Sequence, residues 1–243
     1  MLKRAALAAC ILQLCMATAM AQGVPPGCGS TPAPREQEFA WMSIAQWHRH
    51  HDAHAAIADK DAVDLLFVGD SITMGWDHAI WQRAFGRYRT ANFGIGGDTS
   101  GNLLWRLRDG HAGRLHPRAV VLMIGVNNLG YCKQSPVQAF AGVRAVVEQL
   151  RSLYPQARIL LNAVFPHGQS ARAAQRAPVA ELNRLLARLD DGAHVFFHDY
   201  GALLLQSDGA IAPEIMADFL HPTPQGYQIW ADALSPDIAK LMK

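Results

Sequence analysis

The chain has 243 residues, of which 50% are apolar and 17% are charged, a balance typical of a folded protein with a sizeable core. Its formal net charge is only +2, and the sequence holds no basic patch of the kind that nucleic-acid binding requires. Nucleic acid is therefore not expected as a partner.

Residues 1–21 have the layout of a secretory signal peptide. Lys3 and Arg4 precede an apolar stretch, and the small residues Ala19 and Ala21 suit a cleavage site. The apolar stretch is short for a permanent membrane span. We expect cleavage after Ala21, a secreted or periplasmic location, and no stable membrane span in the mature protein.

Cleavage would leave a mature chain with balanced charge and two cysteines. The count of Lys plus Arg falls from 22 to 20, equal to the 20 Asp plus Glu. Cys28 and Cys132 remain, without metal-ligand spacing. An exported protein can join them as a disulfide, but the sequence does not place their Cα atoms within bonding distance, so pairing and two separate thiols both stay open.

Residues 22–58 are predicted to form a flexible lead-in and an N-terminal helix. "GVPPGCGSTPAP" is rich in Gly and Pro, and "REQEFAWMSIAQWHRHHDAHAAIA" favours a surface helix. Two of its four histidines, His50 and His54, lie one helical turn apart, a spacing compatible with metal binding. No carboxylate or cysteine completes a recognisable ligand set, so we favour a solvated helix face and expect no metal.

Residues 59–243 are predicted to form one α/β domain. Short apolar runs alternate with helical patterns, which indicates βαβ units, a parallel sheet and helices on both faces. Five strands suit a flavodoxin-like, three-layer α/β/α sandwich. The expected strands cover 65–68, 91–95, 119–124, 159–165 and 194–197, and the clearest helices 135–155, 177–192 and 224–242.

Polar or glycine-rich residues follow several of these strands. Gly69-Asp70-Ser71 ends the first, "GIGGDTSGN" follows the second, and "GVNNLGYC" follows the third. A fourth such stretch, "ADFLHPTPQGY", precedes the last helix. Because ligands bind beyond the carboxyl ends of parallel strands, these four stretches are expected to converge.

The converging residues match the needs of acyl transfer. Ser71 can act as nucleophile, His221 as general base, and Asp218, three residues earlier, can orient the imidazole. The Ser71 and Gly97 N–H groups and the Asn127 amide can stabilise the oxyanion. Each residue alone also suits a plain structural role in a loop or cap, and Asp70 and Asp98 are expected to bond nearby backbone N–H groups in their turns.

Gly69-Asp70-Ser71, Gly97, Gly125-Val126-Asn127 and Asp218-x-x-His221 resemble, in order, the four blocks of the GDSL or SGNH hydrolases, most of all the platelet-activating-factor acetylhydrolase-like branch. The resemblance implies a three-layer hydrolase without metal or organic cofactor. It also implies Ser71, Asp218 and His221 as the triad, with Gly97 and Asn127 in the oxyanion hole. Ile72 stands where the family name has Leu, and Asn128 where many members have Asp.

The functional expectation is an exported serine esterase that removes short acyl groups, such as acetyl, from carbohydrate or glycan esters. A lysophospholipase or lipase of the same family is the first alternative. An acyltransferase using the same acyl-enzyme, and a non-catalytic glycan-binding module on the same fold, are the others. No sequence feature predicts an oligomeric state.

Overall fold

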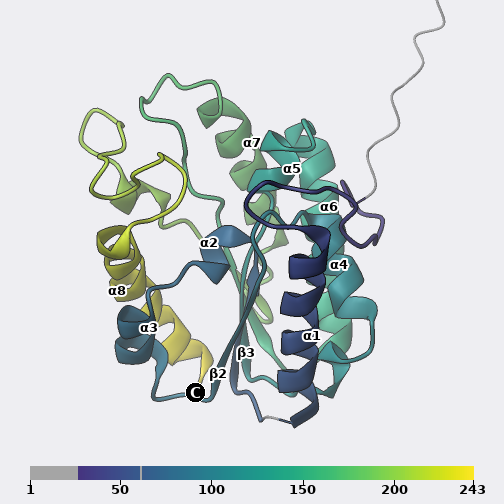
Figure 1. Ribbon diagram of the computed structural model, residues 1–243. Helices are drawn as coiled ribbons and strands as arrows, with labels where there is room; N and C mark the ends of the chain where they lie inside the picture. The colour runs from purple at the N-terminus through teal and green to yellow at the C-terminus, as the bar shows by residue number, and fades with distance from the viewer. Residues whose placement is uncertain (1–26, 61) are drawn as a thin grey trace, which may run out of the picture.

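A computed structural model describes residues 27–60 and 62–243 (Figure 1). The expected signal peptide, residues 1–21, lies outside the described residues. Five parallel strands form one sheet in the order β2-β1-β3-β4-β5. This is the flavodoxin-like order of a doubly wound sheet, so the predicted fold class is confirmed.

The strands differ from the predicted ranges by a few residues at their ends. They are β1 (Leu65–Gly69), β2 (Thr90–Gly94), β3 (Ala119–Met123), β4 (Arg158–Asn162) and β5 (Val195–His198). Every residue of β1 and β3 is buried, as expected for central strands covered on both faces. β4 is shorter than its apolar run, since pairing ends at Asn162 while Ala163, Val164 and Phe165 remain in the core.

Helices cover both faces of the sheet (Figure 1). One side holds α1 (Ile44–Lys60), α4 (Ser100–Arg108), α6 (Pro136–Leu153) and α7 (Arg176–Leu186), and the other holds α3 (His78–Phe85) and α8 (Pro224–Leu241). Two short helices, α2 (Ser71–Met74) and α5 (Val126–Gly130), follow β1 and β3. Ser135 caps α6, with Pro136 in its first turn, as the sequence predicted.

The predicted N-terminal helix begins only at Ile44, because the preceding residues form turns and irregular chain that bond to other parts of the fold. Ser100 Oγ donates to Gly29 O at 2.8 Å, and the N–H of Ala33 donates to Gly101 O at 3.2 Å. Cys28 and Cys132 form a disulfide with Cα atoms 5.8 Å apart. We call residues 27–43 the N-terminal segment; it is bonded to α4 and covalently tied to the chain after α5, unlike the flexible lead-in expected there.

The histidines of α1 do not form the fully solvated face that the sequence favoured. His51 Nε2 contacts Asp109 Oδ2 at 2.5 Å. His54 stacks on Phe93 at 4.6 Å between ring centroids, and burial lowers its pKa to about 2. Within the described part of the chain, no three His, Cys, Asp or Glu side chains gather as a metal site.

None of the helices among the described residues has the length and apolar character needed to cross a bilayer.

Candidate active site

Ser71 is delivered by the end of a central buried strand. It is the first residue of α2, and the preceding Asp70 caps this helix by accepting from the N–H of Ile72 at 3.0 Å. Asp70 is fully buried, and this burial raises the pKa of its carboxyl to about 7. The backbone at Ser71 is therefore fixed by both the sheet and the cap.

Ser71, His221 and Asp218 form a chain of hydrogen bonds. Ser71 Oγ lies 2.9 Å from His221 Nε2, and His221 Nδ1 lies 2.6 Å from Asp218 Oδ2. This order gives the imidazole a carboxylate on one nitrogen and a hydroxyl on the other, as a serine triad requires. The structure thus brings Ser71 to His221, 150 positions later in the chain, and to Asp218, as the sequence predicted.

Asp218 is held ready to accept from the imidazole. Burial raises the pKa of this carboxyl, but hydrogen bonds from the His221 side chain and from the backbone N–H groups of His221 and Leu220 outweigh it, so the pKa is lowered. The side chain stays ionised into the acid range. It can therefore stabilise the imidazolium that forms when His221 takes a proton.

The loop that carries His221 is fastened to the nucleophile's helix. Tyr227 on α8 donates its hydroxyl hydrogen to Ile72 O at 2.8 Å. Thr223 caps α8 two residues after His221, and the N–H of Gly168 donates to Phe219 O at 2.8 Å. These bonds hold the His221 loop at a fixed position relative to Ser71.

The oxyanion donors expected from the sequence also lie side by side. Gly97 has φ of +74°, a conformation that favours glycine, and its N–H donates to no acceptor in residues 27–60 and 62–243. Asn127 Nδ2 donates one hydrogen to Asp98 O at 2.9 Å, which leaves the second amide hydrogen for a ligand. The N–H of Ile95 donates to Gly69 O at 3.2 Å and so joins the Gly97 loop to the end of β1.

Asn128 has a packing role that suits an amide. Its Oδ1 accepts from the Ser100 N–H at 3.0 Å, while its Nδ2 donates to Ser100 Oγ and Gln134 Oε1. An aspartate could not make these two donations. Ser100 and Gln134 therefore supply the acceptors that an Asn at this position needs, in place of the Asp that many family members have. The contact of Asn127 with Asp98 does not involve Asn128.

Asp98 does more than the local turn bonding that the sequence suggested. Its fully buried carboxylate accepts from Trp47 Nε1 at 2.6 Å and Arg106 Nε at 2.8 Å, and it contacts Arg35 at 3.3 Å. Sequence reasoning missed all three partners. Only Arg106 is close to Asp98 in the sequence, eight residues later. Arg35 and Trp47 come from a distant part of the chain.

Three aromatic residues near Gly97 were also missed. Phe39 and Trp41 stack with ring centroids 4.8 Å apart, and Tyr131 meets Phe39 edge-on at 5.3 Å. A Cβ atom on Gly97 would lie 2.8 Å from Trp41 Cη2 and 3.2 Å from Phe39 Cε2. We call Phe39, Trp41 and Tyr131 the aromatic platform; Trp41 is 59% exposed and Tyr131 41%.

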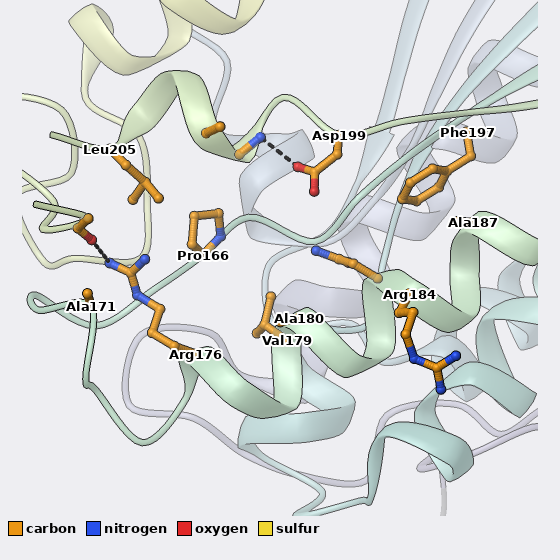
Figure 2. A pocket seen from close by; sticks show the side chains of 14 residues that line it. Pro166, Ala171, Arg176, Val179, Ala180, Arg184, Ala187, Phe197, Asp199 and Leu205 are labelled. Atoms are coloured by element: carbon orange, nitrogen blue, oxygen red, sulfur yellow. Dashed lines mark hydrogen bonds between the residues drawn. The ribbon is translucent and has the colours of Figure 1, made fainter. Parts of the chain in front are cut away.

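A separate cavity of about 560 Å³ lies between α7 and the chain that follows β5 (Figure 2). Arg176 spans one end by donating to Gly209 O at 3.1 Å, and Asp199 accepts from the Gly201 N–H. None of Ser71, Gly97, Asn127, Asp218 and His221 lines it. The candidate site is therefore defined by hydrogen-bond geometry at the ends of β1, β2 and β3, not by this cavity.

The chain is similar to several known proteins in sequence and in fold. The platelet-activating factor acetylhydrolase IB subunit alpha2 of Rattus norvegicus is 33% identical over 184 residues, which cover 75% of this chain and 79% of that protein. A GDSL-like lipase from Bacteroides thetaiotaomicron superposes with a TM-score of 0.62 at 23% identity, over 78% of this chain and 97% of the other. A carbohydrate acetylesterase from Sinorhizobium meliloti superposes with a TM-score of 0.59 at 20% identity, over 74% of this chain and 99% of the other.

These last two likenesses show the fold. The family itself is shown by the sequence, since the model of the GDSL-like lipase/acylhydrolase family matches residues 67–229, more than half of the chain. Together with the relative of 33% identity, this match establishes that the chain belongs to the GDSL-like lipase/acylhydrolase family and is an ester-bond hydrolase.

Proposed function

We propose that the protein is an exported serine esterase that removes short acyl groups, acetyl above all, from carbohydrate esters. The observation that carries the catalytic part is the hydrogen-bonded order of Ser71, His221 and Asp218. Ser71 Oγ attacks the ester carbonyl carbon while His221 takes its proton, and Asp218 stabilises the resulting imidazolium.

The remaining steps follow from the same groups. The oxyanion is stabilised by the N–H groups of Ser71 and Gly97 and by the Asn127 amide. The ester C–O bond breaks as His221 returns the proton to the leaving alcohol, which leaves an acyl-enzyme. His221 then takes a proton from water, the hydroxide attacks the acyl carbon, and Ser71 leaves with that proton.

The proposal is tested by hydrolysis of a panel of acyl esters by the wild-type protein and by Ser71→Ala. We expect Ser71→Ala and His221→Ala each to lower kcat by about 10⁴ to 10⁶, with the double variant little worse, because the residues act as a unit. Equal hydrolysis by wild-type and Ser71→Ala, or no hydrolysis by either, would refute the assignment and favour a non-catalytic module.

The Cys28–Cys132 disulfide supports the export part of the proposal. Disulfides persist in oxidising compartments and are rare in the reducing cytosol. We expect the protein recovered from the periplasm or medium to begin after Ala21, as N-terminal sequencing would reveal. Recovery of the chain only in the cytosol, with its first residue intact, would contradict export.

The aromatic platform supports a carbohydrate substrate. A sugar ring has apolar C–H faces that pack on an exposed indole, and Trp41 offers such a face within contact distance of Gly97. The carbohydrate acetylesterase that shares the fold is compatible with this substrate class. An ester on a bound sugar would then have its acyl carbonyl beside the oxyanion donors.

Substrate choice is tested with Trp41→Ala. For an acetylated xylooligosaccharide we expect KM to rise by about threefold to tenfold, while methyl acetate hydrolysis changes little. Leu203→Ala is the matched control, because Leu203 is a similarly exposed apolar residue outside the platform. A wild-type preference for long acyl chains would overturn the acetyl proposal and favour the lysophospholipase, and product transfer to an added alcohol would favour the acyltransferase.

A further inference from the structure

Arg35 is a buried cation directly behind one of the oxyanion donors. It lies in the N-terminal segment, outside residues 67–229 that the family model matches, and only 4% of its surface is exposed. Its NH2 group donates to Gly96 O at 2.5 Å and contacts Asp98 Oδ1 at 3.3 Å. The triad does not use Arg35, so its burial needs another explanation.

The contact with Gly96 has a direct consequence for Gly97. The Gly96 carbonyl and the Gly97 N–H belong to the same peptide unit, which is planar and trans. In a trans peptide the C=O and N–H point in opposite directions. Holding the carbonyl against Arg35 therefore turns the Gly97 N–H to the other side, where it donates to no acceptor in the described part of the chain.

Glycine makes this restraint necessary. Gly97 has no side chain, so the peptide before it can rotate more easily than one between larger residues. A rotation of the Gly96–Gly97 peptide would replace the N–H donor by a carbonyl oxygen, which repels a developing oxyanion. Arg35 opposes this rotation, because the buried guanidinium would lose its carbonyl acceptor.

Arg35 is itself held in place from several sides. Its guanidinium lies over the rings of Phe39 and Trp47, at 5.2 and 5.8 Å from their centroids. Asp98, which it contacts, is fixed by Trp47 and by Arg106. The same Asp98 supplies the carbonyl that orients the Asn127 amide, so one cluster supports two of the three oxyanion donors.

We propose that Arg35 is a positioning residue that fixes the Gly96–Gly97 peptide with its N–H facing the oxyanion. The inference rests on the proposed esterase function. It assigns part of the catalytic geometry to a segment outside the four sequence blocks.

The test compares kcat, KM and inhibitor affinity in variants of the full chain. Arg35→Ala removes the donor, Arg35→Met removes it while filling the space, and Arg35→Lys keeps a cation that can donate to the carbonyl. Arg89→Ala is the control. Arg89 is an exposed arginine, and its ion pair with Asp64 lies at the amino ends of β1 and β2, whereas the candidate site lies at their carboxyl ends. The inhibitor is a methyl trifluoromethyl ketone, whose adduct with Ser71 carries an oxyanion.

We expect Arg35→Ala and Arg35→Met to lower kcat by about 10- to 100-fold, less than the 10²- to 10³-fold lost when a whole donor is removed. KM should stay within about twofold, since the oxyanion forms only in the transition state. Affinity for the ketone should fall in parallel with kcat, and Arg35→Lys should recover part of both. Arg89→Ala should match the wild type.

Two results would overturn the proposal: unchanged kcat in a folded Arg35→Ala or Arg35→Met variant, or a loss of kcat without a loss of ketone affinity. Arg35→Met decides the question if Arg35→Ala does not fold, since it keeps the packing volume. The comparison with Ser71→Ala keeps the two hypotheses apart. If wild type hydrolyses esters and Ser71→Ala does not, the esterase stands whatever Arg35 does.

Discussion

Two aspartates close to Ser71 have opposite electrostatic environments. Burial raises the pKa of Asp70 to about 7, because bonds from backbone N–H groups do not compensate the carboxylate for the water it loses, and the charge of Asp98 adds to the effect. Asp218 is more exposed, and three donors from His221 and Leu220 lower its pKa despite partial burial. The Asp70 carboxyl is thus suited to cap α2 inside the protein. The Asp218 carboxylate is suited to remain charged beside the His221 imidazole.

The lowered pKa of Asp218 predicts the shape of the acid limb of the pH–rate profile. A general base that already carries a proton cannot accept the one from Ser71, whereas the lowered pKa keeps Asp218 ionised as pH falls. We expect log(kcat/KM) to fall with a slope of about one, the mark of a single titrating group. A slope of two in steady-state assays would mean that Asp218 protonates in the same range.

The raised pKa of Asp70 predicts a stability that falls as pH rises. Between pH 3.8, the ordinary pKa of aspartate, and about 7, the unfolded chain loses this proton while the folded protein keeps it. Relative to Asp70→Asn, the wild type should therefore lose about 4 kcal/mol of unfolding free energy across this window. Urea denaturation at several pH values measures the difference, and parallel curves for the two proteins would refute it.

At the scale of elements, the N-terminal segment is as much a part of the site as the strand ends. Its hydrogen bonds run to α4, and its disulfide reaches the chain directly after α5, the helix that carries Asn127. Arg35 and Trp41 occupy their places because this segment is fastened at its start. A helical segment, as the sequence suggested, would have directed these side chains elsewhere.

Removal of the disulfide should weaken both folding and turnover. Closing a loop of about 100 residues stabilises a folded state by about 2–5 kcal/mol, mainly by restricting the unfolded chain. We expect Cys28→Ser with Cys132→Ser to lower the free energy of unfolding by that amount and to lower kcat. A double variant with wild-type kcat and lower stability would show that Arg35 keeps its place without the tether.

At the scale of the whole molecule, the strand order brings three loops to one edge of the sheet. β1 lies between β2 and β3, so the ends that carry Ser71, Gly97 and Asn127 are neighbours. α8 packs on the opposite side from α4 and brings His221 to Ser71. The central strand that carries the proposed nucleophile thus has candidate oxyanion donors after the strands on both of its sides.

The proposed mechanism uses only side chains and backbone groups of the chain, and this predicts insensitivity to chelators. His54, which together with His50 suggested a metal by spacing, stacks on Phe93, and the neighbouring His51 contacts Asp109. We expect prolonged incubation with EDTA to leave kcat unchanged. A loss of activity that added zinc restores would contradict this expectation and would favour metal binding by the histidines of α1.

The sequence by itself determined the parallel α/β fold, and it selected Ser71, Asp218 and His221 as candidate triad residues and Gly97 and Asn127 as candidate oxyanion donors. Apolar runs specify strands through local periodicity, and the four blocks keep their order along the chain. Strand ends were misplaced by a few residues, because burial of Ala163 to Phe165 continues where strand pairing stops.

Only the tertiary structure decided the pairing of Cys28 with Cys132, the non-helical path of residues 27–43, and the places of Arg35 and Trp41 beside Gly97. The physical reason is that these features depend on contacts between residues far apart in the chain. Local propensity does not encode such contacts, since an arginine in a Pro-rich stretch is ordinarily exposed. Its burial follows from Asp98 and the Gly96 carbonyl, which the fold alone brings to it.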